Sequence, residues 1–129
     1  MKVFIISLLA FISTAGLAQT QSEMNQESYD SLAKADLELN SVYQKILQEY
    51  REDTVFIKNL IKTQKIWIKF RDAQVEMKFP EREPGWYGSM YPMCVSGYLE
   101  KLTRDRIKTL KEWLAGVEDG EGCGGSVKN

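Results

Sequence analysis

The chain has 129 residues, 17 of them basic and 18 acidic, and a net charge of −1 at pH 7, which suits one domain of modest size. So balanced a charge argues against nucleic acid as a partner, because nucleic-acid binding depends on clustered positive charge. The chain has no histidine, only two cysteines and no glycine-rich phosphate loop, so we expect no metal and no cofactor.

The first eighteen residues follow the pattern of a cleaved secretory signal. Lys2 supplies a positive start, residues 3–12 are almost unbroken apolar sequence, and residues 16–18 place small side chains two apart. The apolar run of roughly ten residues is shorter than the about 20 that a membrane-spanning helix needs. A buried N-terminal helix is the alternative interpretation. We expect cleavage near Ala18, which leaves residues 19–129 as a periplasmic or secreted protein that does not span the membrane.

Three segments carry the apolar spacing that is typical of helices, and none alternates like a strand. The first helix is predicted to begin near Thr20, which forms a capping box with Glu23, and to end at residues 51–53. Its apolar face repeats every four and three residues at Leu32, Asp36, Leu39, Tyr43, Ile46 and Tyr50.

The second helix is predicted to start at Asp53 or Thr54, either of which can cap it, and to stop before Pro80. The gap between the first two helices is short, and a short gap predicts an antiparallel hairpin. The apolar face of this helix comprises Phe56, Leu60, Thr63, Trp67, Phe70, Gln74 and Met77.

Residues 81–88 are predicted to form a loop before a third helix. Ser89 can cap this helix, Pro92 suits its first turn, and Gly116 is a natural C-cap. Its apolar face comprises Leu99, Leu102, Arg106, Thr109 and Trp113. The predicted fold class is therefore all-α: an antiparallel helical hairpin plus a third long helix, a three-helix bundle in one domain, with an irregular tail at residues 119–129.

Two cysteines in an exported protein usually form a disulfide, so we expect a bridge between Cys94 and Cys123. A continuous helix from Cys94 to Leu114 would span about 30 Å, and the residues back to Cys123 reach roughly as far when fully extended. The bridge is just possible, and an interruption at Gly97 would ease it. Two free thiols are the alternative.

Polar residues interrupt the predicted apolar faces. Asp36, Arg71 and Arg106 lie on them, and Asn40 and Gln64 fall near the same stripes. Because a buried unpaired charge is costly, we expect Asp36 to pair with Arg71 or with Arg106 across the hairpin. One interpretation is a structural network that fixes the register of the helices.

The other interpretation makes Asp36 a catalytic group in a carboxylate-only glycan hydrolase. Such enzymes use two carboxyl groups about 5–9.5 Å apart, one of them protonated. An arginine partner favours the charged carboxylate, and Asp72, the best companion, lies on a different helical face from Arg71. We therefore expect a protein without enzymatic activity.

The aromatic loop offers candidate partner-binding residues, namely Trp86 and Tyr87 with Tyr91 just beyond them. These rings either cap the open end of the bundle or form an exposed contact patch, since tryptophan and tyrosine carry much interface energy. Glu81 and Glu83 beside them would suit a cationic partner. The remaining lysines and glutamates are interpreted as solvated helix faces.

Several short motifs follow one another in a fixed order through most of the chain. They are Ser22-Glu23-Met24-Asn25, then Ala35-Asp36-Leu37-Glu38-Leu39-Asn40 with Tyr43, then Gln64, Trp67 and Phe70-Arg71-Asp72-Ala73, and finally Gly88-Ser89, Pro92-Met93 and Leu102-Thr103-Arg104-Asp105-Arg106. In this order they resemble the LprI-like lysozyme inhibitor family. The resemblance implies a small exported helical domain, and some members of the family inhibit lysozyme.

The chain departs from the family at its cysteines. Members often carry cysteines at three places that are occupied here by Glu27 or Ser28, by Val75 and by Tyr98. Cys94 and Cys123 therefore look like a substituted bridge.

The resulting hypothesis is an exported envelope protein that binds lysozyme and blocks its cleft by surface contact. The alternative is a periplasmic binding or scaffolding module for another envelope component. Common animal lysozymes are cationic, and the exported chain has a net charge of −2 once Lys2 is removed, so the charges are complementary. The sequence leaves the oligomeric state open.

Overall fold

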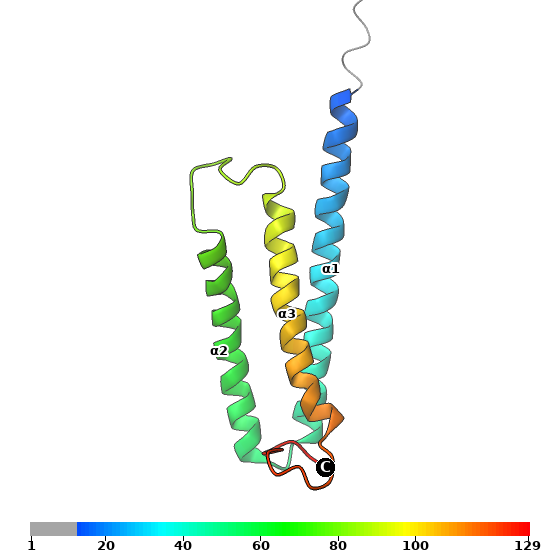
Figure 1. Ribbon diagram of the computed structural model, residues 1–129, viewed down its shortest axis with the longest axis vertical. Coiled ribbons are helices and arrows are strands. Elements are labelled where there is room, and N and C mark those ends of the chain that lie inside the picture. Colours follow the sequence, from blue (N-terminus) through cyan, green and yellow to red (C-terminus); the bar gives the residue numbers. More distant parts are fainter. Residues whose placement is uncertain (1–12) are drawn as a thin grey trace, which may run out of the picture.

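The computed structural model describes residues 13–129, with side chains from Thr20 onward. Three long helices follow one another: α1 (Ser13–Glu49), α2 (Thr54–Lys78) and α3 (Tyr91–Ala115) (Figure 1). The described residues contain no strand, so the predicted all-α class with three helices is confirmed. Residues 1–12 of the predicted signal lie outside the described part, and residues 13–18 form the beginning of α1. The predicted start of the first helix at Thr20 is wrong, because α1 extends back through Gly16 to Ser13.

The ends of α2 agree with the sequence. The Asp53 side chain accepts a hydrogen bond from the backbone N–H of Phe56 at 2.9 Å, so it caps the helix and satisfies an otherwise free donor. The helix ends at Lys78, two residues before Pro80, as predicted.

The two ends of α3 differ in how well they were predicted. Gly116 terminates the helix with a φ of +79°, a conformation that glycine adopts without strain, and this C-cap is confirmed. At the other end the cap is Met90, which makes no side-chain hydrogen bond, so the prediction of Ser89 as the cap is wrong. Pro92 lies in the first turn, as expected.

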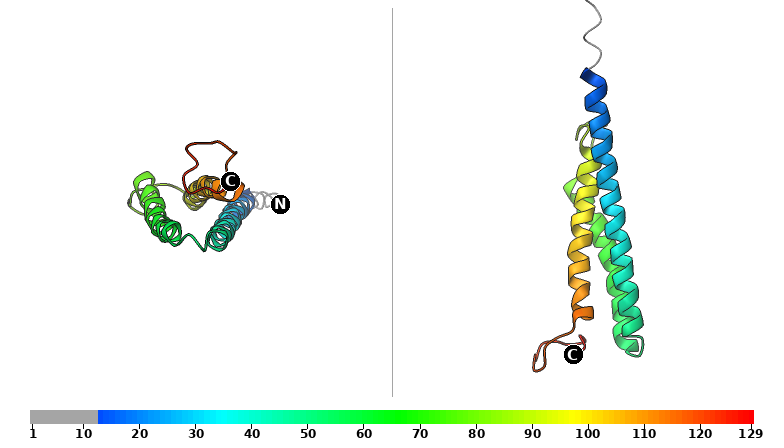
Figure 2. Two further views of the ribbon diagram at one scale, coloured as in Figure 1. Left: turned by 90° about the horizontal axis from the view of Figure 1, so that it is seen from below. Right: turned by 90° about the vertical axis from the view of Figure 1, so that its right-hand side faces the viewer.

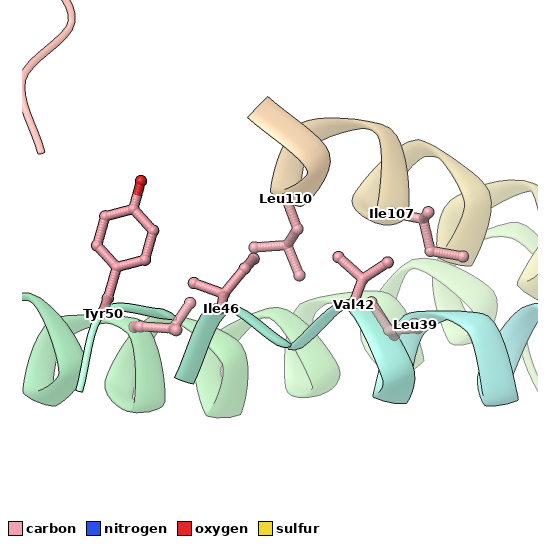
Figure 3. Packing of buried hydrophobic residues seen from close by; sticks show 7 residues of the cluster. Leu39, Val42, Ile46, Tyr50, Ile107 and Leu110 are labelled. Carbon is pink, nitrogen blue, oxygen red and sulfur yellow. The ribbon is translucent and has the colours of Figure 1, made fainter. Parts of the chain in front are cut away.

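The hydrophobic core lies chiefly between α1 and α3 (Figure 3). Side chains of α1 spaced at three, four and four residues face Ile107 and Leu110 of α3. These α1 residues are Leu39, Val42, Ile46 and Tyr50, with Ala35 buried one turn earlier. Complete burial of one such aliphatic side chain stabilises the fold by about 1.5–3 kcal/mol. The core therefore fixes α1 and α3 as the main pair.

The second helix stands apart from this pair. It runs antiparallel to α1, as predicted, but α3 and not α2 is the principal partner of α1 (Figure 2). In α2 only Leu60 and Gln64 are buried. The predicted apolar faces are therefore partly wrong, because Asp36, Phe70 and Met77 are exposed. Spacing alone predicted one face for each helix, whereas α1 contacts its two neighbours along two different faces.

Hydrogen bonds fasten the irregular tail to the base of the bundle. The Tyr50 hydroxyl donates to the carbonyl oxygen of Trp113 at 2.8 Å and accepts from the backbone N–H of Lys128 at 3.0 Å. The Trp113 ring N–H donates to the Ser126 hydroxyl at 3.1 Å, and the Val117 N–H donates to the Lys128 carbonyl. The tail is thus irregular, as predicted, and held in place.

The predicted disulfide is not formed. Cys94 and Cys123 are exposed free thiols. Cys94 lies in the first turn of α3 and Cys123 lies beyond its far end, because the helix runs through Gly97 without interruption. The hydrogen bonds above hold the tail beside Tyr50, so Cys123 cannot follow α3 back toward Cys94.

Candidate partner-binding surfaces

The aromatic residues between α2 and α3 form a cluster at one end of the bundle. The rings of Tyr87 and Tyr91 stack with centroids 4.9 Å apart, and Phe79 meets both edge-on at 5.7 and 5.8 Å. Tyr98 joins the cluster at 6.3 Å from Phe79, and the Tyr87 hydroxyl donates to the Pro80 carbonyl at 2.7 Å. Tyr87 and Tyr91 therefore tie the ends of α2 and α3 together, as in the capping interpretation. Sequence reasoning missed Phe79 and Tyr98, although both are aromatic and adjoin the loop.

Trp86 is the exception in this loop. Its side chain is 69% exposed, with the guanidinium of Arg82 5.9 Å from its ring. Gly85 and Gly88 flank the ring with φ values of +86° and +73°, which only glycine adopts readily. The Trp86 N–H donates to the Glu83 carbonyl at 3.1 Å, and the Gly88 N–H donates to the Gly85 carbonyl at 3.1 Å. Two consecutive turns thus hold an exposed tryptophan at the tip of the loop.

The acidic candidates Glu81 and Glu83 are exposed in the same loop. No ion pair involves either carboxylate within the described chain. The end of the bundle that carries Trp86 therefore also presents unpaired negative charge. Four of the five predicted partner-binding residues are exposed, and Tyr87 is half-buried. Tyr91 is exposed and also stacks on Tyr87 in the aromatic cluster.

The predicted ion pair between α1 and α2 is present. Arg71 Nη1 lies 3.4 Å from Asp36 Oδ1, and Arg71 Nε lies 3.2 Å from Asp72 Oδ1. The Arg71 side chain is 19% exposed and that of Asp36 is 50% exposed. A half-solvated pair of this kind contributes at most about 1 kcal/mol.

A second polar contact joins α2 to α3. Arg106 Nε donates to Gln64 Oε1 at 3.1 Å, and burial of Arg106 lowers its pKa because the charged form loses solvation. The guanidinium groups of Arg71 and Arg106 lie 5.3 and 5.9 Å from the Trp67 ring. Trp67 thus links the two polar contacts through cation–π interactions.

These residues line a groove of about 310 Å³ between α1 and α2. Asn40 lies in the groove wall with no hydrogen bond to the other polar groups of the described chain. The complete lining is Asp36, Leu39, Asn40, Tyr43, Gln64, Trp67, Ile68 and Arg71. All but one of these lining residues, Ile68, belong to the motifs that carry the family resemblance, and their separation in sequence did not reveal that they meet along one groove.

The same geometry bears on the catalytic alternative. Both Asp36 and Asp72 contact the guanidinium of Arg71, so each of these carboxylates is engaged in an ion pair. The described residues contain no group of three or more cysteine, aspartate or glutamate side chains arranged to hold a metal ion. None of the helices in the described part is long and apolar enough to cross a membrane.

The fold and these surfaces define a small all-α protein with an exposed tryptophan loop and a polar groove between two helices. The chain belongs to the lysozyme inhibitor LprI family, whose sequence profile matches residues 13–110. The resemblance drawn from the motifs is thus confirmed. An uncharacterized protein of Rhizobium meliloti (strain 1021) is 33% identical over 113 residues, covering 79% of each chain. No solved structure gives a significant match.

Proposed function

We propose that this protein binds lysozyme through its surface and blocks the substrate cleft of that enzyme, without chemistry of its own. Membership in the lysozyme inhibitor LprI family supports this function. Trp86 is the observation that carries the choice of contact, because it projects from a loop held by two turns and is 69% exposed. An exposed tryptophan on a preorganised loop is the kind of anchor that dominates interface energies.

The charge of this end of the molecule supports the same partner. Glu81 and Glu83 flank the loop, and the exposed acids Glu23, Glu27 and Asp30 follow α1 near its beginning. Common animal lysozymes are cationic, so negative charge around an aromatic anchor would speed encounter and orient the enzyme. The signal-like residues 1–18 support export to the compartment where a lysozyme would be met.

A titration of lysozyme activity with the purified chain from Gln19 onward tests this proposal. We expect stoichiometric inhibition that weakens as salt is raised, because part of the attraction is between charges. Trp86→Ala should weaken inhibition by roughly 30-fold, the loss typical of a central aromatic anchor. Phe70→Ala is the matched control, since Phe70 is exposed on α2 and outside the loop.

Each result has a defined meaning. Lack of inhibition by micromolar protein against several lysozyme types would remove the proposed function. Full inhibition by Trp86→Ala, or equal losses in both variants, would remove the loop as the contact while leaving inhibition itself in place.

The alternative function is a periplasmic binding or scaffolding module for another envelope component. The groove between α1 and α2 favours it, because seven of its eight lining residues belong to the motifs that carry the family resemblance and lie away from the loop. A pull-down from envelope extract distinguishes the two functions. Stable capture of an envelope component other than lysozyme, lost on Trp67→Ala, would support the alternative.

A further inference from the structure

The exposed face of α2 carries a stripe of four lysines. Lys58, Lys62, Lys65 and Lys69 follow at four, three and four residues, which places them on one side of the helix, and all four are exposed. Residues 54–71 contain no acidic side chain. No lysine of the stripe forms an ion pair or a hydrogen bond within the described residues. Since like charges one turn apart destabilise a helix, the stripe does not stabilise the isolated fold.

Large apolar side chains run alongside the lysine stripe. Ile66, Phe70 and Met77 recur at four and seven residues and are 55, 58 and 73% exposed, and Val55 extends the same line toward the start of α2. One isolated exposed apolar residue is ordinary, but four aligned on one helix mark a contact surface. The exposed face of α2 thus joins an apolar line to a line of unpaired cations.

We propose that this face of α2 lies on an anionic phospholipid surface. The line of Ile66, Phe70 and Met77 would enter the boundary between headgroups and acyl chains. Lysines beside that line can extend their alkyl chains along it and direct their ammonium groups to lipid phosphates. A helix with cations beside its apolar side chains has the chemistry of an interfacial helix, which lies parallel to the bilayer plane.

Charge decides against two other occupants. A second copy joined in parallel and in register through α2 would bring two lysine stripes together, because the acids Asp72 and Glu76 follow the stripe only beyond its last lysine. A cationic lysozyme would be repelled for the same reason, so this face is distinct from the proposed inhibitory loop. The inference therefore goes beyond the proposed function and does not depend on it.

The arrangement of the helices suits this orientation. In the end-on view of Figure 2, α2 lies on one side of the molecule, and α1 and α3 lie together on the other. With α2 on the lipid, α1 would face the aqueous side, and its exposed acids Glu23, Glu27 and Asp30 would stay away from the anionic headgroups.

Vesicle flotation tests the proposal with the chain from Gln19 onward, which keeps every buried core residue that the structure describes and lacks the apolar N-terminal run. Circular dichroism checks that each variant stays helical. We expect binding to vesicles of phosphatidylcholine with phosphatidylglycerol, and none to phosphatidylcholine alone. Replacing Lys62, Lys65 and Lys69 together by glutamine should weaken binding by roughly 100-fold, at about fivefold for each lysine.

The matched control replaces three exposed lysines elsewhere, Lys34, Lys45 and Lys108, by glutamine, so the net charge changes equally. It should weaken binding by less than about fivefold. Phe70→Ser should weaken binding by about tenfold through lost apolar contact. Leu37→Ser, at an exposed leucine of α1, should leave binding unchanged.

Four results would overturn the proposal. They are absence of binding to the anionic vesicles, equal binding to neutral vesicles, equal losses in the two triple-lysine variants, and capture by soluble polyglutamate without vesicle binding. The last result would assign the face to an acidic protein. A dimer in light scattering that disappears in the α2 lysine variant, again without vesicle binding, would assign it to a second copy.

Discussion

The α1–α3 pair and α2 are similar in apolar composition but differ in how much they contribute to the core. Helices α2 and α3 each have 25 residues, and both are rich in isoleucine, leucine and aromatic side chains. Nevertheless α1 and α3 bury nearly all of the core, while Leu60 is the single apolar residue of α2 that is fully buried. The apolar residues of α2 are spread around its axis, so one neighbour cannot cover them. Apolar content alone therefore does not decide which helix builds the core.

The second helix is attached by aromatic contacts at its two ends and mainly by polar contacts between them. At its start Phe56 lies 4.6 Å from the Tyr50 ring and 6.1 Å from the Trp113 ring. At its end Phe79 packs in the aromatic cluster of the loop, and the contact between Gln64 and Arg106 supplies a polar link in between. This mode of attachment leaves the outer face of α2 exposed for partners.

The largest expected difference is between two isoleucines. Ile46→Ala removes a completely buried side chain between α1 and α3 and should lower the free energy of unfolding by about 2–5 kcal/mol. Ile66→Ala removes an exposed side chain of α2 and should change it by less than about 0.5 kcal/mol. Urea unfolding followed by circular dichroism measures both. Similar losses in the two variants would contradict the assignment of the core to α1 and α3.

The tail fastening gives the next largest effect. Tyr50→Phe removes a hydroxyl that bonds both Trp113 and Lys128. It should lower the free energy of unfolding by about 1–3 kcal/mol, because the Trp113 carbonyl and the Lys128 N–H lose their hydrogen-bond partner. Tyr29→Phe, at an exposed tyrosine of α1, is the control and should be neutral. Thermal unfolding compares the two, and proteolysis should cut the tail faster only in Tyr50→Phe. An unaffected tail would mean that these hydrogen bonds do not hold it.

A smaller effect concerns the start of α2. Asp53→Ala removes the side chain that caps this helix and should lower stability by about 1 kcal/mol. Asp119→Ala removes an exposed aspartate from the irregular tail and serves as the charge-matched control. Denaturant midpoints of the two variants give the comparison, and indistinguishable midpoints would argue against a stabilising cap.

The smallest effect is a pH dependence on the surface of the α1–α3 pair. The hydrogen bond and then the charge of Lys111, whose Nζ lies 2.6 Å from Glu38 Oε1, lower the pKa of Glu38 from its ordinary value, with a further contribution from Arg104. A lowered carboxyl pKa stabilises the fold above the unfolded-state pKa, and this stabilisation disappears as pH falls through the folded-state pKa. The gap in unfolding midpoint between wild type and Glu38→Gln should therefore close on acidification. A gap independent of pH would exclude this linkage.

The sequence predicted where the helices begin and end better than it predicted which helices pack against each other. Asp53, Pro80 and Gly116 set helix ends through local chemistry, so they could be predicted without knowledge of the rest of the fold. The pairing of Asp36 with Arg71 could also be predicted, because opposite charges on the facing sides of two helices form ion pairs. Spacing could not tell whether α1 packs on α2 or on α3, so the burial of Ala35 and Val42 was missed.

The prediction of the surfaces was limited in the same way. The aromatic loop was found from composition, but the division between a protruding Trp86 and packed Tyr87 and Tyr91 depends on turns and on Phe79 from the end of α2. The prediction of a bridge between Cys94 and Cys123 was wrong because it depended on the path of the tail. Tyr50, which is far from the tail in sequence, sets that path. Contacts between distant segments are what local patterns leave undetermined.

Hydrogen exchange of the isolated protein tests the central claim most directly, namely that α1 and α3 form the stable core while α2 contributes little to it. We predict that amides of residues 39–49 and 103–113 exchange only by global unfolding, whereas those of residues 61–77 exchange through smaller openings at a lower free energy. Equal protection along all three helices, or greater protection in α2 than in α1, would contradict this account.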